Sequence, residues 1–267
     1  MAIASTLLTG RAKPLRALRG HLILMGALLV VGLGLVGTLM ILLVASVLGP
    51  PVRRRRRSQA IISGLFRGLL YLGNRSGIVQ SDLSELDALV DRGPLVVVAN
   101  HPCLLDALLI VSRLPAAVCI MKSQLCRHPL LGVGSWLAGY VPNGSPTQLV
   151  RQSVRALAEG SQLVVFPEGT RTHGRPMADM KGAFATIAVR AACPVVMVAI
   201  DTDSDYATKG WPLWRLPTFP LRYRIRLIGE LDGVSSRETL MRDTAQRFDR
   251  ELAPVAAVAA RESLARP

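Results

Sequence analysis

A run of 28 residues without a charged side chain, from Leu22 to Gly49, constrains the fold of this chain more than any other feature. As a straight α-helix it would be about 42 Å long, whereas the hydrocarbon core of a bilayer is about 30 Å thick. The run is too long for the apolar region of a signal peptide, and the sequence PPVRRRRRS that follows it does not resemble a cleavage site. The sequence therefore predicts a helical segment embedded in a membrane.

Two membrane topologies remain open, because basic residues flank the apolar run on both sides. The flanking residues are Arg11, Lys13, Arg16 and Arg19 before the run, and Arg53–Arg57 after it. One topology is a tilted single span with the arginine cluster on the cytoplasmic side, which basic residues favour. The other is a re-entrant hairpin that bends near Gly32, Gly34 and Gly37, although glycines in such a helix also permit close packing. In both topologies the rest of the chain lies on the cytoplasmic face of the inner membrane.

The excess of positive charge belongs largely to this N-terminal segment. The formal net charge is +14, and the first 57 residues contain nine basic side chains and no acidic one. An arginine cluster directly beside a membrane segment is expected to contact anionic lipid head groups. Aromatic residues make up only 4% of the chain and are not interleaved with the cluster, so we expect membrane lipids and no nucleic acid among the partners.

Two polar motifs each follow directly after an apolar run that predicts a buried strand. Leu95–Ala99 is followed by Asn-His-Pro at residues 100–102, and Gln162–Phe166 is followed by Pro-Glu-Gly-Thr-Arg at residues 167–171. The proline ends the second strand and the glycine permits an unusual backbone turn. Since loops at the carboxyl ends of strands form the ligand crevice of an α/β sheet, we expect the two motifs to face one cleft.

The first motif predicts a histidine–carboxylate pair. If His101 lies at the strand end and Asp106 in the first turns of the next helix, the two side chains can meet. A carboxylate on one ring nitrogen fixes the tautomer and leaves the other nitrogen as a general base. The chain has no GxSxG elbow, so a hydroxyl of the substrate would have to attack. The alternative is a structural histidine, with Asp106 merely favourable near a helix N-terminus.

Helical and strand-like stretches alternate along the remainder of the chain. The predicted strands are Leu95–Ala99, Ala117–Met121, Tyr140–Pro142, Gln162–Phe166 and Pro194–Ile200, with Arg222–Ile228 as a half-exposed edge strand. The predicted helices are Ser81–Val90, Pro129–Gly139, Thr147–Glu159, Lys181–Ala191 and Arg237–Leu252, with Gln59–Gly73 lying on the membrane surface or covering the sheet. Alternation of this kind predicts an α/β fold with a mixed, largely parallel sheet flanked by helices, preceded by the membrane-embedded segment.

Three loops complete this description. Thr172–Asp179 is expected to be an exposed polar loop in which His173 is not a second base. Trp211–Pro220 is a loop that is expected to meet the membrane surface. Asp201–Asp205 is expected to be an ordinary turn, since it lacks the glycine and distal glutamate of a calcium loop. No GxGxxG motif after a predicted strand and no GxxxxGK motif supports a nucleotide site, and no metal site is expected.

Together the motifs resemble those of the glycerolipid acyltransferases, of the 1-acylglycerol-3-phosphate acyltransferase type. The family's first motif, NH followed by four residues and D, appears here as NHPCLLD at residues 100–106. Its third motif, FPEGTR, is unchanged at residues 166–171, and its fourth, a proline in an apolar strand, is matched by Pro194. Order and spacing agree over about residues 95–200.

The resemblance implies an enzyme that moves a fatty acyl group from an acyl thioester, on coenzyme A or acyl carrier protein, to a hydroxyl of a lysolipid. The implied acceptor is 1-acyl-sn-glycerol-3-phosphate, which would give phosphatidic acid for phospholipid biosynthesis. His101 would be the base, oriented by Asp106, and no cofactor is expected. The implied substrate-binding residues are Glu168, Gly169, Thr170, Arg171 and Lys122. Residues 58–267 would form the catalytic domain, after a membrane-anchoring segment over residues 1–57.

The family's second motif is where this chain departs. Ser145 stands where the family has an arginine that holds the phosphate, and Gln124 replaces an acidic residue two positions after Lys122. A phosphate monoester carries close to two negative charges, so the loss of one cation leaves other acceptors open, such as lyso-ornithine lipid. Arg151 and Arg155 are expected on a solvated helix face. An esterase that uses water in place of the acceptor, and a non-catalytic lipid-binding protein, are the alternatives from other classes.

Overall fold

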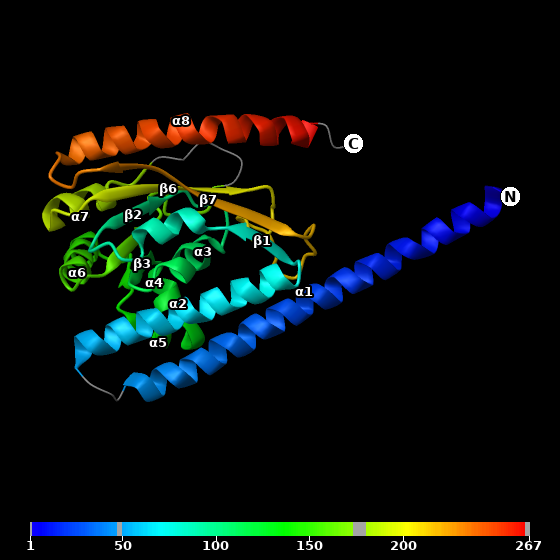
Figure 1. Cartoon of the computed structure of the whole chain (residues 1–267), viewed down its shortest axis with the longest axis horizontal. Coiled ribbons are helices and arrows are strands. Elements are labelled where there is room, and N and C mark those ends of the chain that lie inside the picture. Colours follow the sequence, from blue (N-terminus) through cyan, green and yellow to red (C-terminus); the bar gives the residue numbers. More distant parts are fainter. Residues whose placement is uncertain (1, 47–49, 173–179, 265–267) are drawn as a thin grey trace.

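The computed structural model describes residues 2–46, 50–172 and 180–264 and has a seven-stranded sheet at its centre (Figure 1). The strand order is β1-β7-β6-β2-β5-β3-β4. The strands are β1 (Val79–Asp82), β2 (Val96–Ala99), β3 (Ala117–Met121), β4 (Val141–Pro142), β5 (Gln162–Val165), β6 (Val195–Thr202) and β7 (Leu221–Leu231). The predicted exposed loop around His173 falls almost entirely within residues 173–179, which lie outside the described residues.

Helices cover both faces of this sheet (Figure 1). They are α1 (Ala2–Ser46), α2 (Pro51–Arg75), the 3₁₀ helix η1 (Ser84–Leu89), α3 (Asp106–Arg113), α4 (Ser123–Cys126), α5 (Pro129–Ala138), α6 (Pro146–Ala158), α7 (Ala183–Ala191) and α8 (Arg237–Leu264). The predicted α/β fold with a largely parallel sheet is confirmed, and most predicted elements agree with these bounds to within a few residues.

The strand directions place the two polar motifs at the same end of the sheet, where the parallel strands have their carboxyl ends. β2 pairs in parallel with β5 on one side and β6 on the other, and β3 continues the parallel arrangement beyond β5. The carboxyl ends of these strands therefore lie together. β7 pairs antiparallel with β6 and parallel with β1, so β7 and β1 run in the opposite direction.

β2 is buried on both of its faces. Val97 and Ala99 belong to the apolar cluster under α2 and α3, whereas Val96 and Val98 belong to the cluster under α6, α7 and α8. A strand in the middle of a parallel sheet that is covered on both sides has no solvent-facing positions, which explains its unbroken run of apolar residues.

α1 is one continuous helix through Gly32, Gly34 and Gly37, so the predicted re-entrant hairpin with a bend at these glycines is wrong. A Cβ atom on Gly34 would lie 3.0 Å from Leu65 Cδ1 of α2, so the role of this glycine is close helix packing. α2 contacts α1, α3 and α5, and its Ile62 belongs to the apolar cluster on one face of the sheet. The predicted domain boundary at residue 57 falls inside α2 and stays a prediction.

Two other predictions need correction. The Arg222–Ile228 stretch lies in β7, which is not an edge strand, because β1 covers its outer side. The predicted helix Ser81–Val90 is instead the end of β1 followed by η1. β1 is only four residues long and alternates between half-buried and exposed side chains, so it has little of the apolar character that identifies a strand.

Candidate active site

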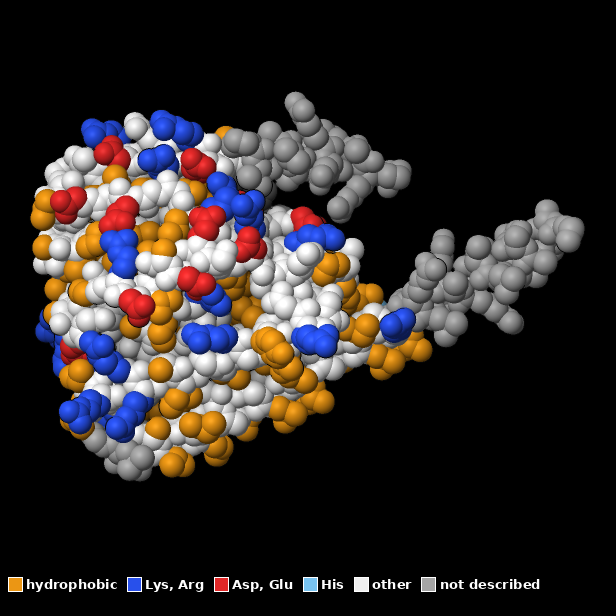
Figure 2. Space-filling model, in the orientation of Figure 1, with side chains coloured by type: hydrophobic (Ala, Val, Ile, Leu, Met, Phe, Trp, Pro, Cys, Tyr) orange, Lys and Arg blue, Asp and Glu red, His pale blue; other side chains and the backbone are white. Residues whose placement is uncertain are grey.

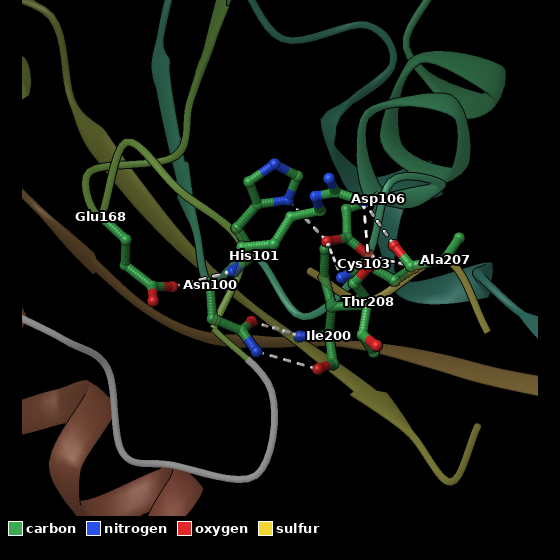
Figure 3. Close-up of polar contacts among 9 residues, drawn as sticks. Asn100, His101, Cys103, Asp106, Glu168, Ile200, Ala207 and Thr208 are labelled. Carbon is green, nitrogen blue, oxygen red and sulfur yellow. Dashed lines mark hydrogen bonds and ion pairs between the residues drawn. The ribbon is translucent and has the colours of Figure 1, made fainter. Parts of the chain in front are cut away.

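The loop between β2 and α3 holds His101 and Asp106 side by side (Figure 3). The Nδ1 atom of His101 lies 2.7 Å from Oδ2 of Asp106. Asn100 fixes the start of this loop, because its side-chain amide donates to the Ile200 carbonyl at 3.0 Å and accepts from the Ile200 N–H at 2.7 Å. The asparagine thereby extends the pairing of β2 with β6 by one residue and sets the position of the histidine that follows.

The carboxylate of Asp106 is fully buried at the first residue of α3. Its Oδ2 accepts a hydrogen bond from the Cys103 N–H at 2.8 Å, and its Oδ1 accepts one from the Cys103 thiol at 3.1 Å. Burial raises the pKa of Asp106, and the hydrogen bonds from His101 and Cys103 oppose that rise by stabilising the ionised form. An ionised Asp106 accepts from Nδ1–H of His101, which leaves Nε2 to accept a proton.

The second motif wraps around the same histidine. Phe166 stacks on the imidazole with ring centroids 4.3 Å apart, and Glu168 accepts a hydrogen bond from the His101 N–H at 2.9 Å. On the other side, the Thr172 N–H donates to the His101 carbonyl at 2.9 Å. The structure therefore brings the two motifs together, as the sequence predicted. It shows the buried Glu168 holding the backbone of His101, a contact that the sequence did not indicate.

Gly169 has two reasons to be glycine. Its φ of +67° lies in the left-handed region, and a Cβ atom there would lie 2.7 Å from Nζ of Lys181. The turn is closed by hydrogen bonds from the Gly169 N–H to the Phe166 carbonyl and from the Lys181 N–H to the Pro167 carbonyl. The lysine therefore lies directly over the turn.

Replacing Gly169 with alanine is expected to lower the melting temperature by a few degrees, because the left-handed conformation costs a residue with a Cβ about 1–2 kcal/mol. Gly64→Ala is the matched control: Gly64 is exposed within α2, and an added Cβ there meets nothing within 4 Å. Alanine is favoured over glycine inside a helix by about 1 kcal/mol, so the control is expected to melt at a higher temperature than the parent chain. Thermal unfolding in detergent checks both signs.

Arg171 forms hydrogen bonds with the long connection between β6 and β7. Its Nη1 atom donates to the carbonyl of Ala207 at 2.8 Å and to that of Thr208 at 3.2 Å. The Leu104 N–H donates to the same Ala207 carbonyl at 3.0 Å. A guanidinium has five N–H donors, so these bonds use only part of its capacity for an anionic ligand.

The two other predicted binding residues, Lys122 and Thr170, lie after the carboxyl ends of β3 and β5. Lys122 is exposed directly after β3, which is separated from β2 by β5, and Ser145 precedes α6. Thr170 is partly buried within the turn. Arg155 pairs with Glu159 at 2.8 Å on an exposed helix face, as predicted.

Cys103 is a part of the site that the sequence did not reveal, because a cysteine in an apolar run is ordinarily only a buried thiol. Burial, together with the neighbouring Asp106, raises the pKa of the Cys103 thiol well above its usual value, so the thiol stays protonated and donates to the carboxylate. Asp106 therefore receives two hydrogen bonds from one residue.

Cys103→Ala is expected to lower kcat/KM by up to about tenfold, because Asp106 loses one donor while its burial is unchanged. The remaining carboxylate is then harder to ionise, so the acid limb of the kcat/KM profile should move to higher pH. Cys103→Ser keeps a donor at the same position and is expected to restore the profile. If alanine and serine give the same acid limb, the thiol has no influence on the pair.

Known acyltransferases are similar to this chain in sequence and in fold. Residues 80–201 match the family model described as Acyltransferase. The chain is similar to 1-acyl-sn-glycerol-3-phosphate acyltransferase alpha of Mus musculus, with 30% identity over 142 residues, which cover 51% of this chain and 49% of that protein. The Homo sapiens protein of the same name is 32% identical over 123 residues, covering 43% of this chain and 44% of that protein. The matches thus span about half the length of these relatives or slightly less.

One solved structure has a similar fold along nearly the whole chain. The 1-acyl-sn-glycerophosphate (LPA) acyltransferase PlsC of Thermotoga maritima aligns with a TM-score of 0.69 and 21% identity, covering 91% of this chain and 98% of that one. The residues that match the Acyltransferase model include the His101–Asp106 pair and the turn at residues 167–171. The part of the chain that holds the candidate site is therefore similar in sequence to acyltransferases, and the overall fold is similar to that of the solved structure.

Proposed function

We propose that this protein transfers a fatty acyl group from an acyl thioester, on coenzyme A or acyl carrier protein, to the free hydroxyl of 1-acyl-sn-glycerol-3-phosphate. The product would be phosphatidic acid. The observation that supports this most directly is the 2.7 Å contact between His101 and Asp106, with the FPEGTR turn packed against the same imidazole. The names of the matched relatives support the acceptor.

The proposed reaction begins with general-base catalysis. Nε2 of His101 takes the proton of the acceptor hydroxyl while that oxygen attacks the thioester carbonyl carbon. Asp106 holds Nδ1–H and stabilises the imidazolium that forms. The tetrahedral intermediate then collapses, the C–S bond breaks, and the thiolate takes the proton back from Nε2. The products are an ester and a free thiol, and the proposal includes no metal ion or cofactor.

The oxyanion of the tetrahedral intermediate needs hydrogen-bond donors that the folded site does not already use. The N–H groups of His101, Cys103 and Gly169 donate to Glu168, Asp106 and Phe166, respectively. These three N–H groups are therefore already used within the folded site. Donors would have to come from the neighbouring residues of the turn or from the substrate-facing N–H groups of Arg171.

The acceptor phosphate would be bound by cations at the same edge of the sheet. Arg171 directly follows the turn at residues 167–170, and Lys181 lies over Gly169 of the same turn, so this turn carries two cations although Ser145 supplies none. Lys122 after β3 would be the third. This arrangement supports a phosphate-bearing acceptor and weakens the case for lyso-ornithine lipid, which stays the alternative.

We also propose that the enzyme works at the cytoplasmic face of a membrane. The apolar stretch Leu18–Ala45 of α1 is long enough to cross a bilayer. Most of its large apolar side chains are exposed, and basic residues flank it on both sides, which supports contact with lipid.

A panel of lysolipid acceptors, each offered with labelled acyl-CoA and with acyl carrier protein, tests the proposal when products are read by mass spectrometry. Phosphatidic acid as the main product from lysophosphatidic acid is the expected result. Acylation of lyso-ornithine lipid alone would overturn the acceptor. Release of free fatty acid at the same rate without any acceptor would overturn acyl transfer and indicate a hydrolase.

A further inference from the structure

The connection between β6 and β7, residues 203–220, contacts α1 at the start of its apolar stretch. A Cβ atom on Gly20 would lie 2.9 Å from Leu216 Cδ2, so the glycine allows the loop to approach the helix closely. The candidate membrane stretch of α1 begins at Leu18. The loop therefore meets the helix just after Arg19 and just before the uncharged run Leu22–Gly49.

The loop is ordered by its own hydrogen bonds and yet exposes two large apolar side chains. The guanidinium of Arg215 lies 4.4 Å from the centre of the Trp211 ring, and the Tyr206 hydroxyl donates to the Leu213 carbonyl at 3.2 Å. Leu213 is nevertheless 41% exposed and Trp214 71% exposed. Tryptophan prefers the boundary between lipid and water, where its apolar ring and its N–H are both satisfied.

α1 presents an apolar surface along the lower edge of the molecule (Figure 2), and Leu216 of the loop contacts this helix at Gly20. The exposed residues of α1 include Leu22, Met25, Leu29, Leu33, Val36, Met40 and Val44. Leu42 near the other end of α1 packs beside Gly134 of α5, so the helix contacts the rest of the molecule at both ends of its apolar stretch. Exposed Arg19, Lys209 and Arg215 accompany the apolar residues near the loop, which suits anionic lipid head groups.

The same loop reaches the active site at its other end. The carbonyls of Ala207 and Thr208 accept from Arg171, and Ala207 is fully buried with a φ of +60°. An alanine in the left-handed region costs energy, so its conformation depends on the contacts around it. One such contact lies in the site, and the loop's other anchor lies on α1.

We propose that this loop docks on a phospholipid bilayer through Leu213 and Trp214, and that docking stabilises the loop conformation that holds Arg171. The membrane would thereby organise an anion-binding side chain of the site at the place where lipid substrates arrive. The link to Arg171 rests on the proposed function, whereas the docking itself does not.

Fluorescence tests the docking without any need for activity. The full-length W136F/W211F variant, which keeps Trp214 as its single tryptophan, is reconstituted into phosphatidylcholine–phosphatidylglycerol vesicles with and without brominated acyl chains. We expect quenching by the brominated lipid and emission at shorter wavelength. The control adds V234W to W136F/W211F/W214F, because Val234 is 74% exposed in the turn before α8, and it is expected to stay unquenched. Equal, weak quenching at both positions would overturn the docking.

Turnover tests the link to Arg171. In the same vesicles, L213S/W214S is expected to lower turnover several-fold with an unchanged amount of bound protein, since α1 still holds the chain. V234S is expected to match the parent chain. Quenching of Trp214 together with full turnover of L213S/W214S would overturn the link. If the parent chain has no acyltransferase activity at all, the proposed function fails, while the fluorescence result on docking still stands.

Discussion

His101→Ala is expected to reduce acyl-transfer turnover by about 10²–10⁴-fold, the usual contribution of a general base. The variant loses Nε2, the nitrogen that would take the proton of the acceptor hydroxyl, while Asp106 and the FPEGTR turn are expected to keep their places. The fold should survive, because the backbone of His101 supplies the bonds to Glu168 and Thr172 and alanine retains both. Turnover of purified protein in vesicles, with circular dichroism as a check on folding, measures the effect.

His128→Ala is the matched control for this experiment. His128 precedes α5, where its Nδ1 accepts from the Leu130 and Leu131 N–H groups and thus caps the helix. Losing a cap costs about 0.5–2 kcal/mol of stability, so the control is expected to melt earlier and to keep its turnover. A His101→Ala chain that is folded and still turns over at the parent rate would show that the His–Asp pair is structural and that the base lies elsewhere.

The parts of the fold and site that depend on local patterns were predictable from the sequence. Apolar runs identify β2 and β5 because both strands are buried on both faces, and each strand's end fixes where its polar motif lies. The pairing of His101 with Asp106 follows from a spacing of five residues across one strand–helix junction. Such contacts need no knowledge of the rest of the chain.

Contacts between distant segments were not predictable in this way. The sequence indicated that Arg171 binds an anionic head group of the substrate, yet it also donates to Ala207, 36 residues farther along the chain. The alternating side chains of β7 predicted an edge strand. The sequence of β1 is short and half-polar, so it did not indicate a strand that pairs with β7. The packing of Gly34 against Leu65 depends on two helices folding back on each other. In each of these three cases the contact joins residues that only the tertiary structure brings together.

Asp106→Asn is expected to reduce turnover by about 10²–10⁴-fold, close to the effect of removing the base itself. An asparagine amide that donates to Nδ1 forces the imidazole into the tautomer with its proton on Nε2, which then cannot accept a proton from the acceptor. The amide also cannot stabilise the imidazolium. Asp87→Asn is the control, because Asp87 is an exposed carboxylate whose pairing with Arg113 should matter by no more than about 1 kcal/mol. Parent-like turnover of Asp106→Asn would contradict the orienting role.

Asp106→Asn is also expected to change how the free energy of unfolding depends on pH. Because burial raises the pKa of Asp106, the folded state binds this proton more tightly than the unfolded chain. The contribution of Asp106 to stability is therefore complete below the ordinary pKa of an aspartate, about 3.9, and is lost as the pH rises through the folded-state pKa. Asparagine does not titrate, so the free energy of unfolding of Asp106→Asn should lack this fall and, at neutral pH, equal or exceed that of the parent chain. Urea unfolding at several pH values from 4 to 8 measures the difference. A variant that is less stable than the parent chain at neutral pH but not at pH 4 would show that the ionised carboxylate stabilises the fold.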